Sequence, residues 1–214
     1  MIKVLFFDFW GTLVENGVWS PIKQVRTILG IKAPFSEYVV RMEKVVMTKN
    51  FDSLREAFQA LCADFTVLCT EEQLDSLVGM WNKSWMLAKP YEEVGEMLQQ
   101  LAQKYRLVLV SNTDCFSINS VLEKYALKRY FEKIVFSCEV GKIKTDEDFF
   151  PTILLDLQLL PQEGLMVGDS LQSDIEPAER AGMHAILIDR KNSREHGQKI
   201  GSLRELEKKI GELL

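Results

Sequence analysis

The chain of 214 residues lacks the features on which several classes of protein depend. It has no uninterrupted apolar stretch near 18 residues, and its N-terminal apolar run, residues 2–7, is too short for a signal peptide or a membrane span. The formal net charge is −5, so the basic surface that nucleic-acid binding needs is missing. We therefore expect a cytoplasmic protein with no membrane or nucleic-acid partner.

Cysteine and histidine are also scarce. The four cysteines are Cys62, Cys69, Cys115 and Cys138, none of them in a CxxC pair, and no spacing of Cys or His suggests zinc. Cys62 and Cys69 could be neighbours. We expect reduced, buried or half-buried thiols in a reducing cytoplasm rather than a disulfide.

Short apolar runs that do not alternate with polar residues recur along the chain. They lie at residues 2–7, 107–110, 134–136, 165–167 and 185–188, and helix-length segments separate most of them. This pattern is typical of parallel strands covered on both faces. The fold class that we predict is α/β, with a Rossmann-like three-layer core around a parallel sheet.

Helical periodicity marks the segments between these runs, and one segment differs from the rest. Residues 17–88 show no clear strand but four amphipathic helical stretches, so we predict an all-helical cap at 16–88 inserted into an α/β core of residues 1–15 and 89–214. Near the C-terminus, Ser173 and Glu176 resemble a capping box, and Gly182 suits the end of a helix over 174–181.

Polar residues follow four of the predicted strands or stand between them. Asp8 follows the first run and precedes Gly11-Thr12; Ser111-Asn112, Lys144 and Asp169 with Asp174 come later, in that order. Ligands of parallel α/β sheets bind beyond the carboxyl ends of the strands, so we expect these side chains to meet there.

This set of residues suits attack of a carboxylate on an anionic phosphate. Such attack needs a cation, and Mg²⁺ prefers hard oxygen ligands, which Asp8, the backbone carbonyl of Trp10 and Asp169 can supply. Asp174 could hold a metal-bound water, support the ligands from behind, or merely begin a helix. Thr12 would brace the first loop.

The other polar residues would act on the substrate. Ser111 and Asn112 can donate hydrogen bonds to the transferring oxygens, and Lys144 supplies a fixed positive charge there. Lys142, two residues away, is a rival for that last role.

The four motifs in this order closely resemble those of the haloacid dehalogenase superfamily, and the helical insertion looks like its C1-type cap. The resemblance covers the sheet-forming parts of the chain and implies the same roles for the same residues, with Mg²⁺ as cofactor and a small phosphorylated molecule as substrate. One departure is Thr145, where the superfamily usually has Pro after the lysine.

Trp10 stands where phosphatases of the superfamily usually carry a second acid, which protonates the leaving oxygen. Indole has no proton to exchange near neutral pH, so that help is missing at this position. The superfamily's haloacid dehalogenases typically have Tyr there, but they lack a metal and replace the residue corresponding to Asp169 by Ser.

We favour a Mg²⁺-dependent phosphatase with an aspartyl-phosphate intermediate on Asp8, because an extra carboxylate beside Asp8 would repel it without a cation. A 2-haloacid dehalogenase forming an ester on Asp8 is the first alternative, and a non-catalytic ligand-binding or regulatory protein is the second. The sequence does not indicate the oligomeric state. Candidates for the cap surface over the site are Trp19, Arg26, Arg41, Lys44, Trp81 and Trp85.

Overall fold

The computed structural model describes residues 1–213 and contains a six-stranded sheet in the order β5-β4-β1-β6-β7-β8, in which every pair is parallel. Its strands are β1 (Val4–Phe7), β4 (Arg106–Ser111), β5 (Lys133–Phe136), β6 (Gly164–Gly168), β7 (His184–Ile188) and β8 (Lys199–Ile200). Each of the five apolar runs forms a strand, while the short edge strand β8 was not predicted. The predicted α/β fold is confirmed.

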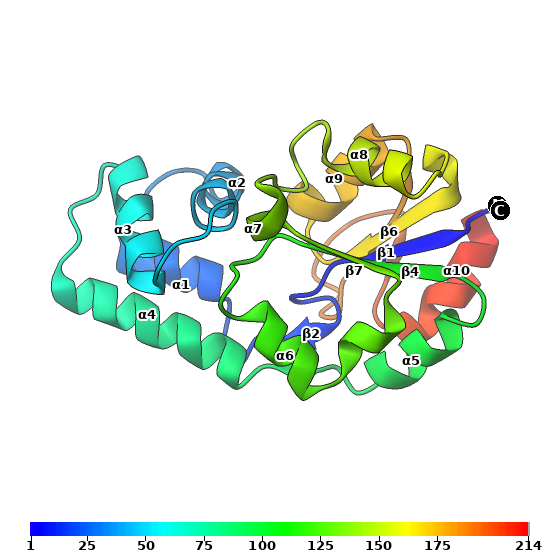
Figure 1. Ribbon diagram of the computed structural model, residues 1–214, viewed down its shortest axis with the longest axis horizontal. Helices are drawn as coiled ribbons and strands as arrows, with labels where there is room; N and C mark the ends of the chain where they lie inside the picture. The colour runs from blue at the N-terminus through cyan, green and yellow to red at the C-terminus, as the bar shows by residue number, and fades with distance from the viewer. Residues whose placement is uncertain (214) are drawn as a thin grey trace.

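Helices cover both faces of this sheet (Figure 1). Because side chains alternate along a strand, Leu5 and Phe7 pack on one face and Val4 and Phe6 on the other. The first face is covered by α5 (Val94–Leu101), α6 (Ile118–Lys124) and α10 (Leu206–Leu213), and the second by α8 (Phe149–Asp156) and α9 (Glu176–Arg180). The short helix α7 (Ser137–Val140) follows β5 directly.

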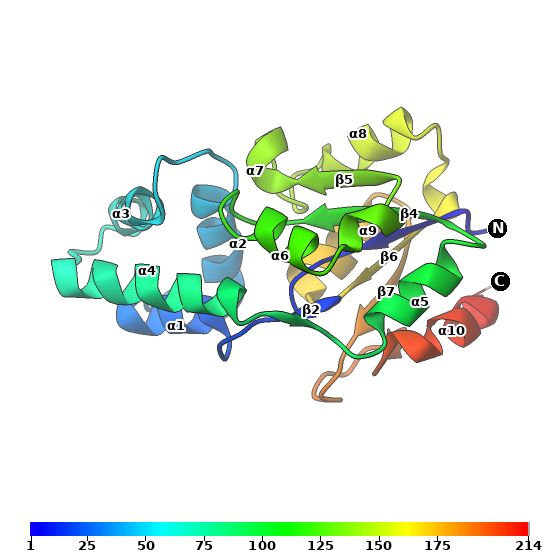
Figure 2. The same cartoon turned by 60° about the horizontal axis from the view of Figure 1, so that its bottom comes forward.

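Four of the helices that lie between β1 and β4 in the sequence gather at one end of the molecule (Figure 2). They are α1 (Pro21–Ile28), α2 (Phe35–Val46), α3 (Leu54–Asp64) and α4 (Glu71–Met86). Their apolar side chains form a hydrophobic cluster of their own, with Tyr38, Phe58 and Leu77 fully buried in it.

Both chain connections to these helices run side by side. One connection, β2 (Val14–Glu15), pairs antiparallel with the other, β3 (Lys89–Pro90), in a two-stranded sheet. Within residues 1–213, no helix combines the length and apolarity needed to cross a membrane.

The helix predicted over 174–181 begins differently. A π-helical turn over Leu171–Ile175 precedes α9, and the side chain of Ser170, not Ser173, accepts a hydrogen bond from the backbone at this start. The predicted end is correct: Gly182 has a φ of 79°, which favours glycine. Ser173 was misassigned because two serines three residues apart compete for one capping position, and its hydroxyl is used elsewhere.

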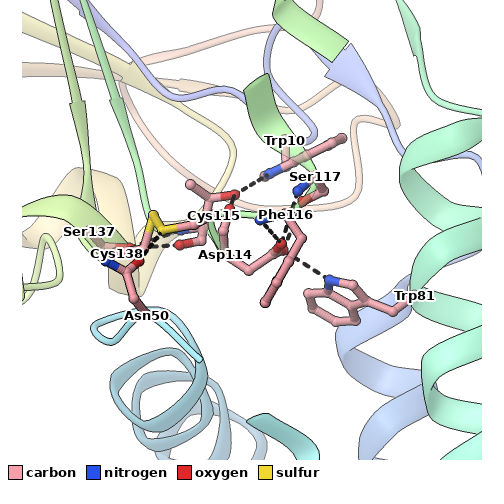
Figure 3. Close-up of a disulfide and its surroundings, with 10 residues drawn as sticks. Trp10, Asn50, Trp81, Asp114, Cys115, Phe116, Ser117, Ser137 and Cys138 are labelled. Atoms are coloured by element: carbon pink, nitrogen blue, oxygen red, sulfur yellow. Dashed lines mark hydrogen bonds between the residues drawn. A yellow bond between two sulfur atoms is a disulfide. The ribbon is translucent and has the colours of Figure 1, made fainter. Parts of the chain in front are cut away.

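The cysteines also depart from expectation. Cys115 and Cys138 form a disulfide with their Cα atoms 5.9 Å apart (Figure 3). Cys62 and Cys69 are free. The disulfide joins the loop after β4 to the start of α7. The sequence could not reveal this pairing, because 23 residues separate the two positions and only the parallel pairing of β4 with β5 brings them together.

Candidate active site

Two of the predicted acids meet where neighbouring strands end. Asp8 follows β1 and Asp169 follows β6, and these strands are paired in register. Gly11, with a φ of 81°, lets the two loops approach, since a Cβ there would lie 2.5 Å from Oδ2 of Asp169. Thr12, which we predicted to brace this loop, donates a hydrogen bond of 3.1 Å to Oδ2 of Asp8.

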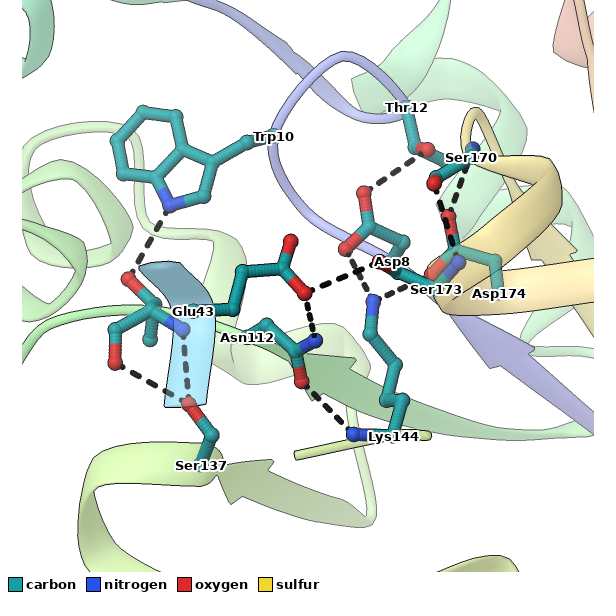
Figure 4. A network of polar contacts seen from close by, with 11 residues as sticks. Asp8, Trp10, Thr12, Glu43, Asn112, Ser137, Lys144, Ser170, Ser173 and Asp174 are labelled. Atoms are coloured by element: carbon teal, nitrogen blue, oxygen red, sulfur yellow. Dashed lines mark hydrogen bonds and ion pairs between the residues drawn. The ribbon is translucent and has the colours of Figure 1, made fainter. Parts of the chain in front are cut away.

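Lys144 is the buried cation of the site. Its Nζ lies 2.7 Å from Oδ1 of Asp8 and also donates to Asp174 (Figure 4), and its side chain is only 2% exposed. Lys142, by contrast, pairs with Asp148 at the surface. The structure therefore brings Lys144, and not its rival, to the predicted nucleophile.

Three carboxylates crowd around this lysine. Asp8, Asp169 and Asp174 each offer an oxygen, and these atoms all lie within 4.8 Å of one another. Arg194 adds a second positive charge 3.9 Å from Asp169, at a partly exposed position. Two cations therefore face three carboxylates.

The excess of carboxylates over cations shifts the pKa values of the groups in this cluster. Burial raises the pKa of Asp8 to about 6, against the attraction of Lys144 and with the repulsion of Asp174. Burial, with repulsion from Asp8 and Asp174, raises the pKa of Asp169 to about 8, although its side chain is 36% exposed, so that solvent moderates this shift. Burial alone would lower the pKa of Lys144, but Asp174 and Asp8 raise it above its usual value. The carboxylates thus hold more negative charge than the protein itself compensates.

The Ser111-Asn112 motif divides into one residue on the cavity wall and one behind it. Asn112 accepts a hydrogen bond of 3.0 Å from the backbone N–H of Lys144 and lines the cavity. Ser111 ends β4, is fully buried and does not line the cavity; its Oγ finds no partner among the described residues. An orphaned hydroxyl at this edge of the sheet is suited to donate to a ligand that reaches it.

The active-site residues open into a cavity of about 790 Å³. Trp10 lines it, and its indole N–H donates a hydrogen bond of 3.2 Å to Oγ1 of Thr113. From the helical insertion and the loop before it, the cavity is lined by Trp19, Trp81 and Trp85, but not by Arg26, Arg41 or Lys44.

Two of the basic residues that do not line the cavity, Arg41 and Lys44, form ion pairs away from it. Arg41 pairs with Asp64 within the helical insertion, and Lys44 pairs with Asp146 of the core at 3.0 Å. Arg41 is therefore not placed to contact a substrate in this cavity.

Sequence reasoning missed several residues around the site. Glu43 contacts Asn112 and Ser173, and Asp114 accepts a hydrogen bond of 2.9 Å from the indole of Trp81. A signal existed for Glu43: it occupies the apolar face of an amphipathic helix, where a charged residue needs a reason. Asp114 and Ser173 carried no such signal, because short polar residues are ordinary in loops and helix starts.

The protein has a parallel sheet covered by helices, a buried lysine–carboxylate cluster at the carboxyl edge of that sheet, and a helical insertion beside it. These features are typical of an enzyme of the α/β class. Residues 5–188 match the family model described as haloacid dehalogenase-like hydrolase, and the chain belongs to that family. The predicted family and the prediction of a hydrolase are confirmed.

Relatives over nearly the whole length are phosphatases by name. The chain is 26% identical to a glyceraldehyde 3-phosphate phosphatase of Methanothermobacter thermautotrophicus over 94% of its length and 93% of that protein. It is 32% identical to the human N-acylneuraminate-9-phosphatase, over 89% and 84% of the two chains. The crystal structure of a HAD phosphatase from Thermococcus onnurineus shares the fold, with a TM-score of 0.63 over 98% of each chain at 24% identity.

Proposed function

We propose that this protein is a Mg²⁺-dependent phosphatase that hydrolyses small phosphate esters through an aspartyl-phosphate on Asp8. The main support for this proposal is the close approach of Asp169 and Asp174 to Asp8. One carboxylate oxygen from each lies within 4.8 Å of the others, and the pKa values of Asp8 and Asp169 are raised. Such a cluster suits a hard divalent cation. The phosphatase names of the relatives support the same reading.

The residues present fit a Mg²⁺ ion. Asp8, Asp169 and the backbone carbonyl of Trp10 would hold it, with Asp174 supporting the ligands from behind. When bound, the ion supplies the positive charge that allows an anionic carboxylate to approach an anionic phosphate.

The chain's own groups perform the transfer. A carboxylate oxygen of Asp8 attacks phosphorus and releases the alcohol, and water then opens the resulting aspartyl-phosphate. Lys144 stabilises the charge on the transferring oxygens from its fixed position beside Asp8, and Asn112 on the cavity wall donates hydrogen bonds to them. Ser111 lies behind that wall, so its hydroxyl donates only to an oxygen that reaches past Asn112. Residues 16–88 act as a cap that excludes water and contacts the distant end of the substrate, while residues 1–15 and 89–214 form the catalytic core.

The test is a screen of the purified protein against phosphate esters and 2-haloacids. We expect phosphate release from nitrophenyl phosphate that requires added Mg²⁺ and stops with a chelator. Trp10 is the one observation that favours the dehalogenase alternative, and chloride release from 2-chloropropionate without metal would establish it. Turnover of neither substrate, with ligands still raising the melting temperature, would indicate a binding protein.

A further inference from the structure

Helix α2 belongs to the helical insertion, and its Glu43 places a buried carboxyl group against residues of the core. Tyr38, Val39, Met42 and Val46 form the apolar face of this helix, and Glu43 lies among them, only 6% exposed. A carboxyl group in such a position costs free energy unless it is hydrogen-bonded or neutral, so its presence calls for a function.

The contacts of Glu43 are with active-site residues of the core. Its Oε2 accepts hydrogen bonds of 2.8 Å from Nδ2 of Asn112 and 3.0 Å from Oγ of Ser173. Asn112 in turn holds the backbone of Lys144. Figure 4 shows the carboxyl between the Trp10 side chain and the Asp8–Lys144 pair, with Oε1 free of these bonds. Glu43 also lines the cavity, so this second oxygen is available to a substrate.

Hydrolysis of an alkyl phosphate needs a proton on the leaving oxygen, and Trp10 cannot supply one. Most other acids of the cavity have their own partners: Asp8 and Asp174 pair with Lys144, Asp114 accepts bonds from Trp81 and Ser117, and Asp189 accepts one from the backbone N–H of Arg194. Glu15 also lines the cavity, but it is exposed and lacks the burial that raises the pKa of Glu43. Asp169 belongs to the carboxylate cluster.

The ionisation of Glu43 suits an acid that works near neutral pH. Burial raises its pKa to about 7, and repulsion from Asp174 adds to this, while Lys144 and the hydrogen bonds from Asn112 and Ser173 oppose it. Around pH 7 the group is therefore present in both its protonated and its ionised form, as acid–base catalysis in two steps requires.

We propose that Glu43 is a catalytic residue of the proposed phosphatase, on which this inference rests: its carboxyl replaces the acid missing at Trp10 and protonates the leaving oxygen. As the bond between Asp8 and phosphorus forms and the ester P–O bond breaks, the proton passes from Glu43 to the departing alcohol. In the second step, Glu43 takes a proton from the water that attacks phosphorus, and the bond to Asp8 breaks. Alcohol and inorganic phosphate leave, and both side chains return to their starting states.

The experiment compares the wild type with Glu43→Gln and the control Glu37→Gln, an exposed glutamate on the same helix. Each is assayed with Mg²⁺ on glycerol 2-phosphate and on nitrophenyl phosphate, whose leaving group needs no proton. Glutamine still accepts the bonds from Asn112 and Ser173. We expect Glu43→Gln to lower kcat about 100-fold or more on the alkyl ester and no more than about threefold on the nitrophenyl ester. Glu37→Gln should match the wild type on both.

A pH profile and a rescue variant separate an acid from a structural role. The wild type should lose alkyl-ester activity as the pH rises above about 7, and Glu43→Gln should lack this decline. Adding Trp10→Asp to Glu43→Gln should restore hydrolysis of the alkyl ester and leave the nitrophenyl ester little changed.

The outcomes that overturn the proposal are distinct from those that overturn the function. Equal losses on the two esters, or unchanged alkyl-ester hydrolysis by Glu43→Gln, would show that Glu43 only holds the cap, and the phosphatase would stand. A wild type that hydrolyses neither ester would overturn the proposed function and the role of Glu43 together. Retained nitrophenyl phosphate activity shows that the variant is folded.

Discussion

The Nζ atom of Lys144 lies 2.7 Å from Oδ1 of Asp8, and both side chains are almost completely removed from solvent. Asp174 completes the cluster by accepting from the same ammonium group. A nucleophile held in this way is oriented by its neighbour, whose charge favours the ionised carboxylate against the burial that raises its pKa, so the two residues depend on each other for both stability and activity.

Asp8→Asn tests the nucleophile directly. Asparagine preserves the shape, its carbonyl oxygen can still accept from Lys144, and its NH2 group can donate to the hydroxyl of Thr12, but the amide does not attack phosphorus. We expect phosphate release to fall below about 1% of the wild-type rate, with the circular dichroism spectrum unchanged. A folded variant with substantially more activity than this would exclude Asp8 as the nucleophile.

Lys144→Met tests the buried ion pairs. Removing one partner of a buried pair leaves uncompensated charge, so we expect the free energy of unfolding to fall by about 3–5 kcal/mol. Lys142→Met is the matched control, because Lys142 pairs with Asp148 at the surface, and its loss should cost less than about 1 kcal/mol. Urea unfolding measures both variants, and a similar small cost for the two would contradict the structural importance of Lys144.

The raised pKa values predict how pH and Mg²⁺ act together. The pKa values of Asp8 and Asp169 are about 6 and about 8 in the folded protein and about 3.9 in an unfolded chain. The stability that these groups contribute is fully present below about pH 4 and is lost as the pH rises towards 8. Without metal, the melting temperature should therefore decline over this range.

Added Mg²⁺ should raise the melting temperature more at pH 8 than at pH 6, since protons compete with the cation for the same oxygens. In Asp169→Asn, both the decline between pH 6 and pH 8 and the response to Mg²⁺ should shrink. Thermal unfolding at the two pH values checks this. An increment from Mg²⁺ that is independent of pH, or unaltered in Asp169→Asn, would argue against a cation at this cluster.

The strands and the residues that follow them were predictable because local sequence determines both. An apolar run such as 165–167 can only be buried, and the carboxyl ends of parallel strands share one edge, so Asp8 and Asp169 had to lie close together. The sequence left Lys142 as a rival of Lys144, and the structure gives the physical difference: the Lys144 ammonium is buried among carboxylates, whereas the Lys142 ammonium pairs with Asp148 at the surface.

What the sequence could not provide depends on how separate segments pack. Glu43 reaches Asn112 only because α2 packs against the core, and no local pattern encodes that angle. The same holds for Ser111, whose place behind the cavity wall follows from the exact end of β4. The pairing of Cys115 with Cys138 likewise depends on the order of strands in the sheet.

The disulfide provides the last prediction. Cys115 lies in the same loop as Asn112, and Cys138 neighbours Ser137, whose Oγ accepts from the backbone N–H of Thr113. Closing a loop of 23 residues restricts the unfolded chain, so reduction should lower the free energy of unfolding by about 3 kcal/mol. Reduction should also raise KM, because the loop with Asn112 loses one of its attachments to α7.

Cys138→Ser should have the free energy of unfolding of the reduced wild type, and dithiothreitol should not lower it further. The control Cys62→Ser removes a free thiol, so dithiothreitol should lower its free energy of unfolding as it does for the wild type. Alkylation followed by mass spectrometry determines the starting state: before reduction, only Cys62 and Cys69 should react in the unfolded protein. If all four cysteines of the purified protein were alkylated without reductant, the bond would be absent, and the Asn112 loop would be held to α7 by the hydrogen bonds between Ser137 and Thr113.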